Sequence, residues 1–537
     1  MSTETSCAGV NRNWAIAFCI LSTAFVLFFN LGGRSIENND YPHFAEIGRE
    51  ILETGDWVIM HSGGEMYVDK PPLHTIFIAL SDIIFGVNAF AGRFPAAFWA
   101  LIGVCATLLF GLRMDRQKWQ TGVYGAMLLL SSYGFFILAR RFRNDIDYSM
   151  LFSLALFSFY EGYEALEPRR KWLYYGLFWF STGLASLVKG PAALLPLLII
   201  IVFLLVTKSW SRVNGKIFFA TFAAFFIVVA PYLVLLVSHK DFAQFAETLR
   251  THTIMNRNAG LFYYIPVFPA KFFPGSLLLL PCIPLFWKKR REIAANPRLF
   301  FLFIWSGLYL VLIHLPKAKV YRYLLPVFPP LSLLTAWGIG QVLPLERWAP
   351  QVKRFWKIPA ALVCLGFPVA ICLKWGLMWQ AIVLGVAAFG MLAVAGGKMR
   401  DAVVLLCSTC IACMLFIDVL HTARNSEVST NLKLYTMLQE KQIKDNEVLI
   451  YKTTGRLRYM LCFYFNKFLH PEIEDNLTLH QGIRAVLTDP GNVEDVTAVF
   501  GQPAEQRIVK GHHGEESEGD HAVLFYDGGS PPRLPGV

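Results

Sequence analysis

Long apolar runs alternate with short polar segments along most of the chain. Each run is close to the ~20 residues that a helix needs to cross a bilayer. We predict about 13 transmembrane helices, at 14–31, 94–112, 119–138, 148–165, 172–188, 190–207, 217–238, 272–287, 299–315, 323–345, 358–373, 375–396 and 402–420. The pattern therefore predicts a polytopic, mostly α-helical membrane protein whose first run is an uncleaved signal anchor.

The run 74–90 does not fit this pattern, because it is short and carries Asp82 at its middle. A carboxylate at the bilayer centre is costly, so we expect this run to lie at the interface or to be re-entrant. If it does not cross, one side of the membrane receives the basic loops 113–118, 169–171, 208–216, 288–291, 347–357 and 398–400. The positive-inside rule makes that side cytoplasmic and predicts a cytoplasmic N-terminus.

The composition supports the same class of protein. Hydrophobic residues make up 55% of the 537 residues and charged residues only 16%. The net charge of +11 comes from basic clusters between apolar runs, as the positive-inside rule requires, so we do not expect a nucleic-acid partner. The protein is expected to contact membrane lipids instead.

The segment 422–537 has the composition of a soluble domain and is expected on the outer side. We predict a helix at 431–441, strands at 447–451, 485–488 and 522–526, and an apolar segment at 460–468. The chain is thus divided into a membrane domain, 1–421, and a small outer α/β domain, 422–537.

The first outer loop, 34–92, contains the most informative sequence. Residues 40–54 place Phe44, Ile47 and Ile51 on one helical face and charged residues on another, which predicts an amphipathic helix at the membrane surface. Asp40 stands just before this helix. It is either the N-cap or a carboxylate that faces a cavity, and the sequence leaves both readings open.

Lys70 follows in the same loop and directly precedes Pro71 and Pro72. Two prolines fix an extended, rigid backbone. A lysine held rigidly at the level of the lipid headgroups is a candidate partner for a lipid phosphate.

The second outer loop carries Arg140, Arg141 and Arg143 on the side that should be poor in positive charge. Guanidinium groups suit phosphate, which gives these arginines a functional reason to be there. Asp145 and Asp147 follow; they orient a sugar or the arginines, or they belong to a simple salt-bridge network.

Further cations fall on the same outer face. Lys189 precedes Gly190-Pro191 at the turn between two runs, and Lys317, Lys319 and Arg322 precede a late run. Cations from four separate outer segments together predict an anion-binding site at membrane depth.

These segments, in this order over roughly residues 14–345, resemble the C-type glycosyltransferase superfamily. The nearest branches are the bacterial lipid A aminoarabinose transferases and the dolichyl-phosphate-mannose protein mannosyltransferases. The resemblance rests on FAEIGRE with GDW, YVDKPPL, ARRFRND, LVKGP and KVYRYLLPVFPP. Asp69 stands where relatives often have Glu, and the residues between Asp40 and Phe44 also depart from the family pattern.

The resemblance implies a sugar donor linked to polyprenyl phosphate, undecaprenyl in bacteria, and an inverting displacement on the periplasmic side of the inner membrane. It implies that Asp40 and Asp145 are the catalytic carboxylates, with Asp40 as candidate general base. The implied phosphate-binding residues are Lys70, Arg140, Arg143, Lys189, Lys319 and Arg322, and the accessory or acceptor positions are His43, Glu46, Asp69, Asp147 and Tyr323. The acceptor stays open between lipid A, another glycolipid and a protein.

No cofactor is required by this chemistry, but a divalent metal stays open as an alternative. The candidate ligands on the outer side match no recognised ligand spacing; they are Asp69, His43, His61, His74 and His252. A transporter or flippase of lipid-linked sugars would need two matching halves, and we find no internal repeat. An O-antigen ligase or polymerase would carry its large outer loop late in the chain, whereas here the richest loop follows the first run.

Overall fold

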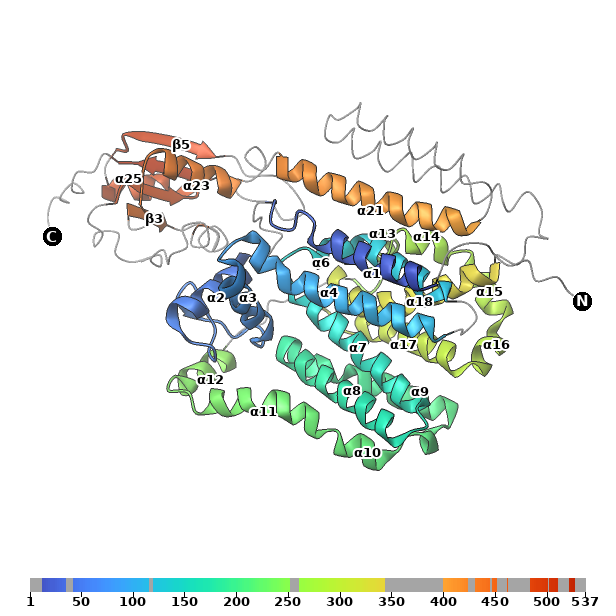
Figure 1. The fold of residues 1–537 in the computed structure, drawn as a ribbon. Coiled ribbons are helices and arrows are strands. Elements are labelled where there is room, and N and C mark those ends of the chain that lie inside the picture. The colour runs from blue at the N-terminus through green and yellow to red at the C-terminus, as the bar shows by residue number, and fades with distance from the viewer. Residues whose placement is uncertain are drawn as a thin grey trace, which may run out of the picture.

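The computed structural model describes residues 12–34, 42–114, 119–251, 260–342, 399–423, 430–444, 447–451, 461, 483–500, 502–509 and 521–526. Most of this chain is helical, and the long helices lie side by side in one bundle (Figure 1). Asp40 and the predicted runs 358–373 and 375–396 lie outside the described residues.

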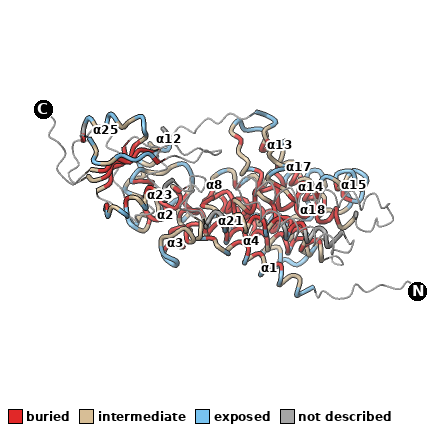
Figure 2. The backbone as a smooth tube through the Cα atoms, turned by 90° about the horizontal axis from the view of Figure 1, so that it is seen from above, coloured by how far each residue is buried: buried red, intermediate tan, exposed pale blue. Residues whose placement is uncertain are grey.

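The helices of the first part are α1 (Arg12–Phe28), α2 (Pro42–Thr54), α3 (Leu73–Phe85), α4 (Ala89–Leu112), α5 (Gln120–Ser131), α6 (Tyr133–Ala139), α7 (Asn144–Glu164), α8 (Pro168–Lys189) and α9 (Leu195–Thr207). The next are α10 (Gly215–Ala220), α11 (Ala223–Val237), α12 (Phe242–Thr251), α13 (Tyr264–Lys271), α14 (Gly275–Leu279), α15 (Cys282–Lys288), α16 (Arg290–Ala295), α17 (Pro297–His314), α18 (Phe328–Val342) and α21 (Met399–Ala423). Three short 3-10 helices connect them: η2 (Gly190–Leu194), η3 (Trp210–Arg212) and η4 (Tyr321–Val327). Buried residues run along the middle of the bundle (Figure 2).

Five helical stretches of the described chain are long and apolar enough to cross a membrane, or up to seven if each bent pair counts as one span. One of the five, Pro168–Thr207, doubles back at η2: Lys189 pairs with Asp145 at the start of α7, whereas Phe203 packs on Tyr163 near its end. Another, Gly215–Val237, has only 11% of its apolar window buried and so presents apolar side chains to lipid. The protein is therefore a multi-pass membrane protein, and the described residues do not confirm the predicted count of about 13 spans.

Two predicted straight spans are broken. The run 119–138 forms α5 and α6, which meet at an angle of 69° where Ser132 has an extended backbone. The run 272–287 belongs to a bent pair in which α13 and the stretch Gly275–Lys288 meet at 102°. Pro274 lies at this break and has no amide hydrogen for a helical bond.

The first outer loop forms a compact unit at one end of the bundle (Figure 1). The predicted helix is α2, and its Gly48 lies directly against Ile78 of α3. The 13 residues of α3 span only about 20 Å, so α3 is too short to cross a bilayer, in line with the interfacial prediction for 74–90.

The polar face of α2 is not open to water as its pattern suggested. Glu46, Arg49 and Glu50 are buried. Glu50 accepts hydrogen bonds from the amides of Gly63 (2.9 Å) and Gly64 (2.6 Å) in the turn between β1 (His61–Ser62) and β2 (Glu65–Met66). Both glycines have positive φ, which this tight turn requires. The loop's own hairpin therefore covers the charged side of the helix.

The C-terminal segment contains a four-stranded sheet in the order β3-β4-β6-β5. Its strands are β3 (Val448–Tyr451), β4 (Ala485–Thr488), β5 (Glu505–Val509) and β6 (His521–Phe525), with helices α23 (Thr430–Glu440) and α25 (Val493–Phe500) and the 3-10 turn η8 (Pro490–Asn492). β3 and β4 are parallel, and the other pairs are antiparallel. The predicted helix and three predicted strands are present. β5 and α25 were not predicted, and most of 460–468 lies outside the described residues.

Candidate active site

Asp145 is the centre of a largely buried charge cluster built from three turns at one end of the bundle. It lies in the first turn of α7, and its side chain is 7% exposed. Its Oδ1 lies 2.6 Å from Lys189 Nζ at the end of α8, and its Oδ2 lies 3.0 Å from Arg322 Nε in η4. Segments that are far apart in the sequence therefore meet at one carboxylate.

The lysine of this cluster is held by aromatic rings. Lys189 Nζ lies 4.8 Å from the ring centroid of Tyr148 and 5.4 Å from that of Tyr323. The Tyr148 hydroxyl donates to the Ala192 carbonyl at 2.8 Å and so ties α7 to the turn that follows α8. Gly190 has a φ of +59°, which explains the glycine in the Lys-Gly-Pro turn. This turn directs Lys189 back toward α7.

Two more cations belong to this neighbourhood. Arg143 is buried and close enough to Asp145 for direct charge–charge interaction, and Lys70 is similarly close to Lys189. Lys70 itself is exposed, with its ammonium donating to the Asp69 carbonyl at 3.1 Å. Three cations thus lie around one carboxylate and a fourth, Lys70, lies near Lys189, which leaves a net positive site suited to an anion.

Comparison with known proteins fits this geometry. The model of the family described as dolichyl-phosphate-mannose-protein mannosyltransferase matches residues 69–235, a range that begins beside Lys70 and includes Asp145 and Lys189. An undecaprenyl phosphate-alpha-4-amino-4-deoxy-L-arabinose arabinosyl transferase of Serratia proteamaculans is 28% identical over 408 residues, covering 70% of each chain. A Pseudomonas aeruginosa protein of the same name is 28% identical over 338 residues, covering 61% of this chain and 60% of that one.

Solved structures share the whole fold. The crystal structure of ArnT from Cupriavidus metallidurans in the apo state has a TM-score of 0.75 at 18% identity and covers 95% of this chain and 97% of its own. The same protein bound to undecaprenyl phosphate gives a TM-score of 0.74, with 96% and 98% covered. The chain therefore shares the fold of this protein, and its sequence is similar to those of the undecaprenyl phosphate arabinosyl transferases. The resemblance seen in the sequence is confirmed.

Arg140 is buried and bound by other parts of the protein rather than open to a ligand. Its guanidinium donates to the carbonyls of Val26, Leu27 and Phe29 at the end of α1, at 2.6 to 2.9 Å. It also pairs with Asp418 of α21 at 2.8 Å, with its side chain 4% exposed. The arginine predicted to bind phosphate thus caps one helix and joins it to another.

Replacing Arg140 by Met should therefore destabilise the protein. The change leaves Asp418 and three helix-end carbonyls without their donor, and breaking a buried ion pair on one side costs about 3 to 5 kcal/mol. Thermal unfolding of the detergent-solubilised protein measures the effect. Arg170→Met, which removes an exposed ion pair with Glu167, is the matched control and should cost under about 1 kcal/mol. Equal stability of both variants would contradict the capping role.

The remaining predicted positions are spread around loop one and η4. Glu46 forms a two-fold hydrogen-bonded pair with Arg49, at 2.8 and 3.0 Å, and burial raises the pKa of Glu46 to about 7 although this pair opposes the shift. The ring of His43 lies tilted against that of Tyr67, with ring centroids 5.8 Å apart. Lys319 is buried and donates to the Pro316 carbonyl of its own turn at 2.7 Å. Tyr323, next to Arg322 in η4, also reaches the charge cluster, with its ring centroid 5.4 Å from Lys189 Nζ.

The histidines considered as metal ligands do not gather in the part of the chain that the structure describes. No group of three or more His, Cys, Asp or Glu side chains among those residues is placed to hold a metal. His74 instead pairs with Asp147, with Nδ1 2.7 Å from Oδ2. The sequence did not indicate this partnership, because 73 residues separate the two.

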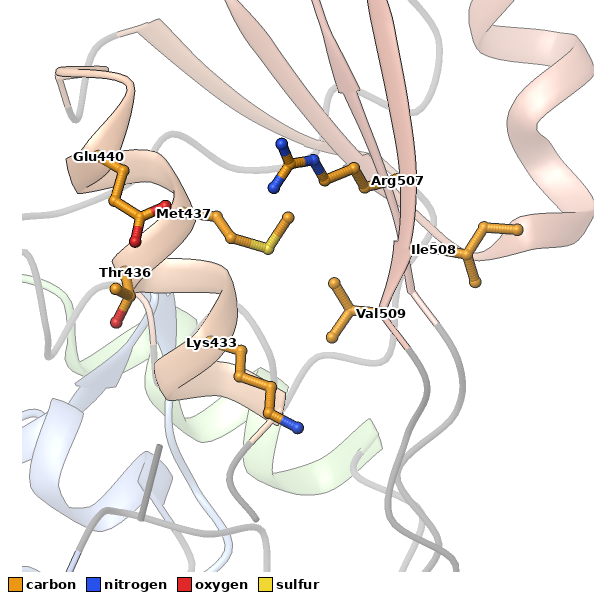
Figure 3. A pocket seen from close by; sticks show the side chains of 7 residues that line it. All are labelled: Lys433, Thr436, Met437, Glu440, Arg507, Ile508 and Val509. Carbon is orange, nitrogen blue, oxygen red and sulfur yellow. The ribbon is translucent and has the colours of Figure 1, made fainter. Parts of the chain in front are cut away.

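A separate groove lies on the C-terminal sheet, between α23 and the edge strand β5 (Figure 3). Lys433 and Met437 line it from the helix, and Arg507 and Val509 line it from the strand. None of the predicted site residues contributes to it. The charge cluster around Asp145 therefore remains the candidate active site.

Proposed function

We propose that this glycosyltransferase transfers a sugar from undecaprenyl phosphate to lipid A on the periplasmic side of the bacterial inner membrane, with inversion at the anomeric carbon. The observation that carries the proposal is the cluster of Lys70, Arg143, Lys189 and Arg322 around Asp145. The similar arabinosyl transferases support undecaprenyl phosphate as carrier and 4-amino-4-deoxy-L-arabinose as the sugar.

The cluster suits a phosphate leaving group. The acceptor oxygen attacks the anomeric carbon, the bond from that carbon to the phosphate oxygen breaks, and its electron pair leaves with undecaprenyl phosphate. Lys70, Lys189 and Arg322 stabilise the charge that grows on this phosphate, and Lys189 and Arg322 act more strongly because their side chains are only 13% and 15% exposed. Asp145 keeps Lys189 and Arg322 in place before the donor arrives.

Asp40 is proposed as the general base. A hydroxyl acceptor must give up its proton as it attacks, and a carboxylate at the entrance of α2 is placed by the sequence to take it. A lipid A phosphate is already anionic, so with that acceptor Asp40 would position the group. Another glycolipid or a protein would require the proton transfer.

The charge distribution favours an enzyme over a transporter or an O-antigen ligase. The described cations of the site lie in turns at one end of the bundle, near α7, η2 and η4, rather than along a path through it. We also propose that residues 422–537 form a periplasmic domain and that loop 34–92 lies beside it, since both lie at the same end of the bundle (Figure 1).

This orientation predicts which cysteines are labelled from outside. Arg291→Cys should be protected from a membrane-impermeant maleimide in intact spheroplasts and labelled after lysis, because the basic loop at 288–291 is cytoplasmic. Arg507→Cys in the C-terminal sheet should be labelled without lysis. Both positions are exposed, so access to the reagent depends on the side of the membrane. Labelling of Arg291→Cys from outside would overturn the orientation.

Mass spectrometry of surface lipids tests the substrate. Lipid A from a strain that lacks this protein should lose a pentosamine substituent, and the intact gene should restore it. A variant with Lys70→Met should not restore it. Unchanged lipid A, with a sugar missing from another glycolipid or from a protein, would reject lipid A as acceptor.

A further inference from the structure

We propose that His74 and Asp147 form a buried positioning pair that holds the first outer loop against α7 and so keeps Lys70 at the charge cluster. This inference rests on the proposed function, because it assigns the pair to the site that binds the lipid phosphate. Neither residue touches the reacting atoms in this role.

The contact is short and shielded. His74 Nδ1 lies 2.7 Å from Asp147 Oδ2, and the two side chains are 2% and 0% exposed. The ring of Phe44, which belongs to α2, packs edge-on against His74 with centroids 5.1 Å apart and so covers the imidazole. A hydrogen bond to a carboxylate is strengthened where water is excluded. This pair is therefore a strong link between α3 and α7.

Neither His74 nor Asp147 has a second side-chain hydrogen bond, to any group that the structure describes, that would compete with the bond between them. His74 Nε2 and Asp147 Oδ1 are both buried and make no hydrogen bond to any group that the structure describes. With Nδ1–H donating to Asp147, Nε2 is left as an acceptor. The single bond between them therefore determines how the imidazole and the carboxylate are oriented.

His74 and Asp147 join the first outer loop, which carries Lys70, to the first turn of α7, which carries Asp145. Asp147 follows Asp145 by two residues in the first turn of α7, so the two carboxylates point in different directions: Asp145 toward Lys189 and Arg322, and Asp147 toward loop one. A shift of α7 against loop one would change both contacts together.

The connection from His74 back to Lys70 is stiff. Pro71 and Pro72 lie between them, and each has a fixed φ. Thr75 Oγ1 and the Ile76 amide both donate to the Pro72 carbonyl, at 2.8 and 2.9 Å, which ties the second proline to the first turn of α3. Because His74 is held against α7, the backbone position of the exposed Lys70 is fixed as well, and with it the distance over which the side chain extends to the lipid phosphate.

A double variant, His74→Phe with Asp147→Leu, tests the pair without leaving a buried charge alone. We expect it to fold and to bind undecaprenyl phosphate about tenfold more weakly, because a pre-organised cation contact is lost. The KM for the donor should rise, while kcat at saturating donor stays within about threefold, since the reacting groups are intact. Hydrogen exchange of residues 67–76 should become faster.

Two further variants separate positioning from general damage. His74→Asn keeps an N–H at a similar distance from the backbone and should restore the affinity to within about twofold, because the bond to Asp147 is retained. The control is Asp56→Leu with His239→Phe. That pair, at 3.4 Å, also joins loop one to another part of the bundle, the turn between α11 and α12, but Asp56 lies 14 residues before Lys70, so its loss should leave the affinity unchanged.

A folded double variant with wild-type affinity and wild-type exchange at 67–76 would overturn the proposal. Faster exchange with unchanged affinity would equally overturn it, because the link would then not serve the phosphate site. Wild-type protein that fails to bind undecaprenyl phosphate would contradict the proposed function instead, and the exchange measurement would still decide whether the pair holds the loop.

Discussion

Replacing Asp145 by Asn is expected to lower the transfer rate on the order of 100-fold and to destabilise the protein. The carboxylate lies between Lys189 and Arg322, at 2.6 and 3.0 Å, so its loss leaves two partly buried cations to repel each other. Moving such preorganised charges away from the leaving group has effects on the order of 10²- to 10³-fold. Removing one partner of a buried ion pair also lowers the free energy of unfolding by about 3 to 5 kcal/mol.

Glu161→Gln provides a matched control at the other end of the same helix. Glu161 is also held by two cations, Arg113 at 2.7 Å and Arg298 at 2.9 Å. This variant should lose stability but keep its turnover per folded molecule, because Glu161 lies far along α7 from the charge cluster. Equal losses of turnover in both variants would show that Asp145 has only a structural role.

Asp40→Asn is expected to abolish measurable transfer while leaving expression and undecaprenyl phosphate binding unchanged. With a hydroxyl acceptor, a general base contributes about 10²- to 10⁴-fold to the rate, and an amide cannot take the proton. With a phosphate acceptor, the loss comes from an acceptor that is no longer positioned by the carboxylate. The measurement compares single-turnover transfer with binding of undecaprenyl phosphate by the same preparation.

The control for Asp40 is Glu53→Gln, which removes a half-exposed carboxylate of the same loop that pairs with Arg49. It should retain transfer within about threefold, since exposed ion pairs contribute little. Full activity of Asp40→Asn would remove this carboxylate from the mechanism.

The sequence singled out candidate site residues but did not indicate how they meet. Apolar runs and charge asymmetry predicted the membrane class, the interfacial α3 and the outer cations, because these follow from local composition. The convergence of Lys189 and Arg322 on Asp145 depends on the packing of α7, α8 and η4, which no local pattern encodes.

The differences between expectation and structure have physical causes. Arg140 matched a phosphate-binding pattern, yet it caps α1, because carbonyls at a helix end attract a guanidinium as a phosphate does. The charged face of α2 is buried because Glu50 binds the Gly63-Gly64 turn. Strand β5 escaped prediction because it is a mostly exposed edge strand, so its sequence EQRIV lacks the apolar run of a central strand.

Turnover of a defined donor tests the central claim most directly. Purified protein in liposomes, given undecaprenyl phosphate carrying 4-amino-4-deoxy-L-arabinose together with lipid A, should release undecaprenyl phosphate in equal amount to the modified lipid A formed. The release should need no nucleotide and should be lost in Lys70→Met. Modified lipid A without released undecaprenyl phosphate, or a wild-type rate in Lys70→Met, would contradict a lipid-borne phosphate held by this set of cations.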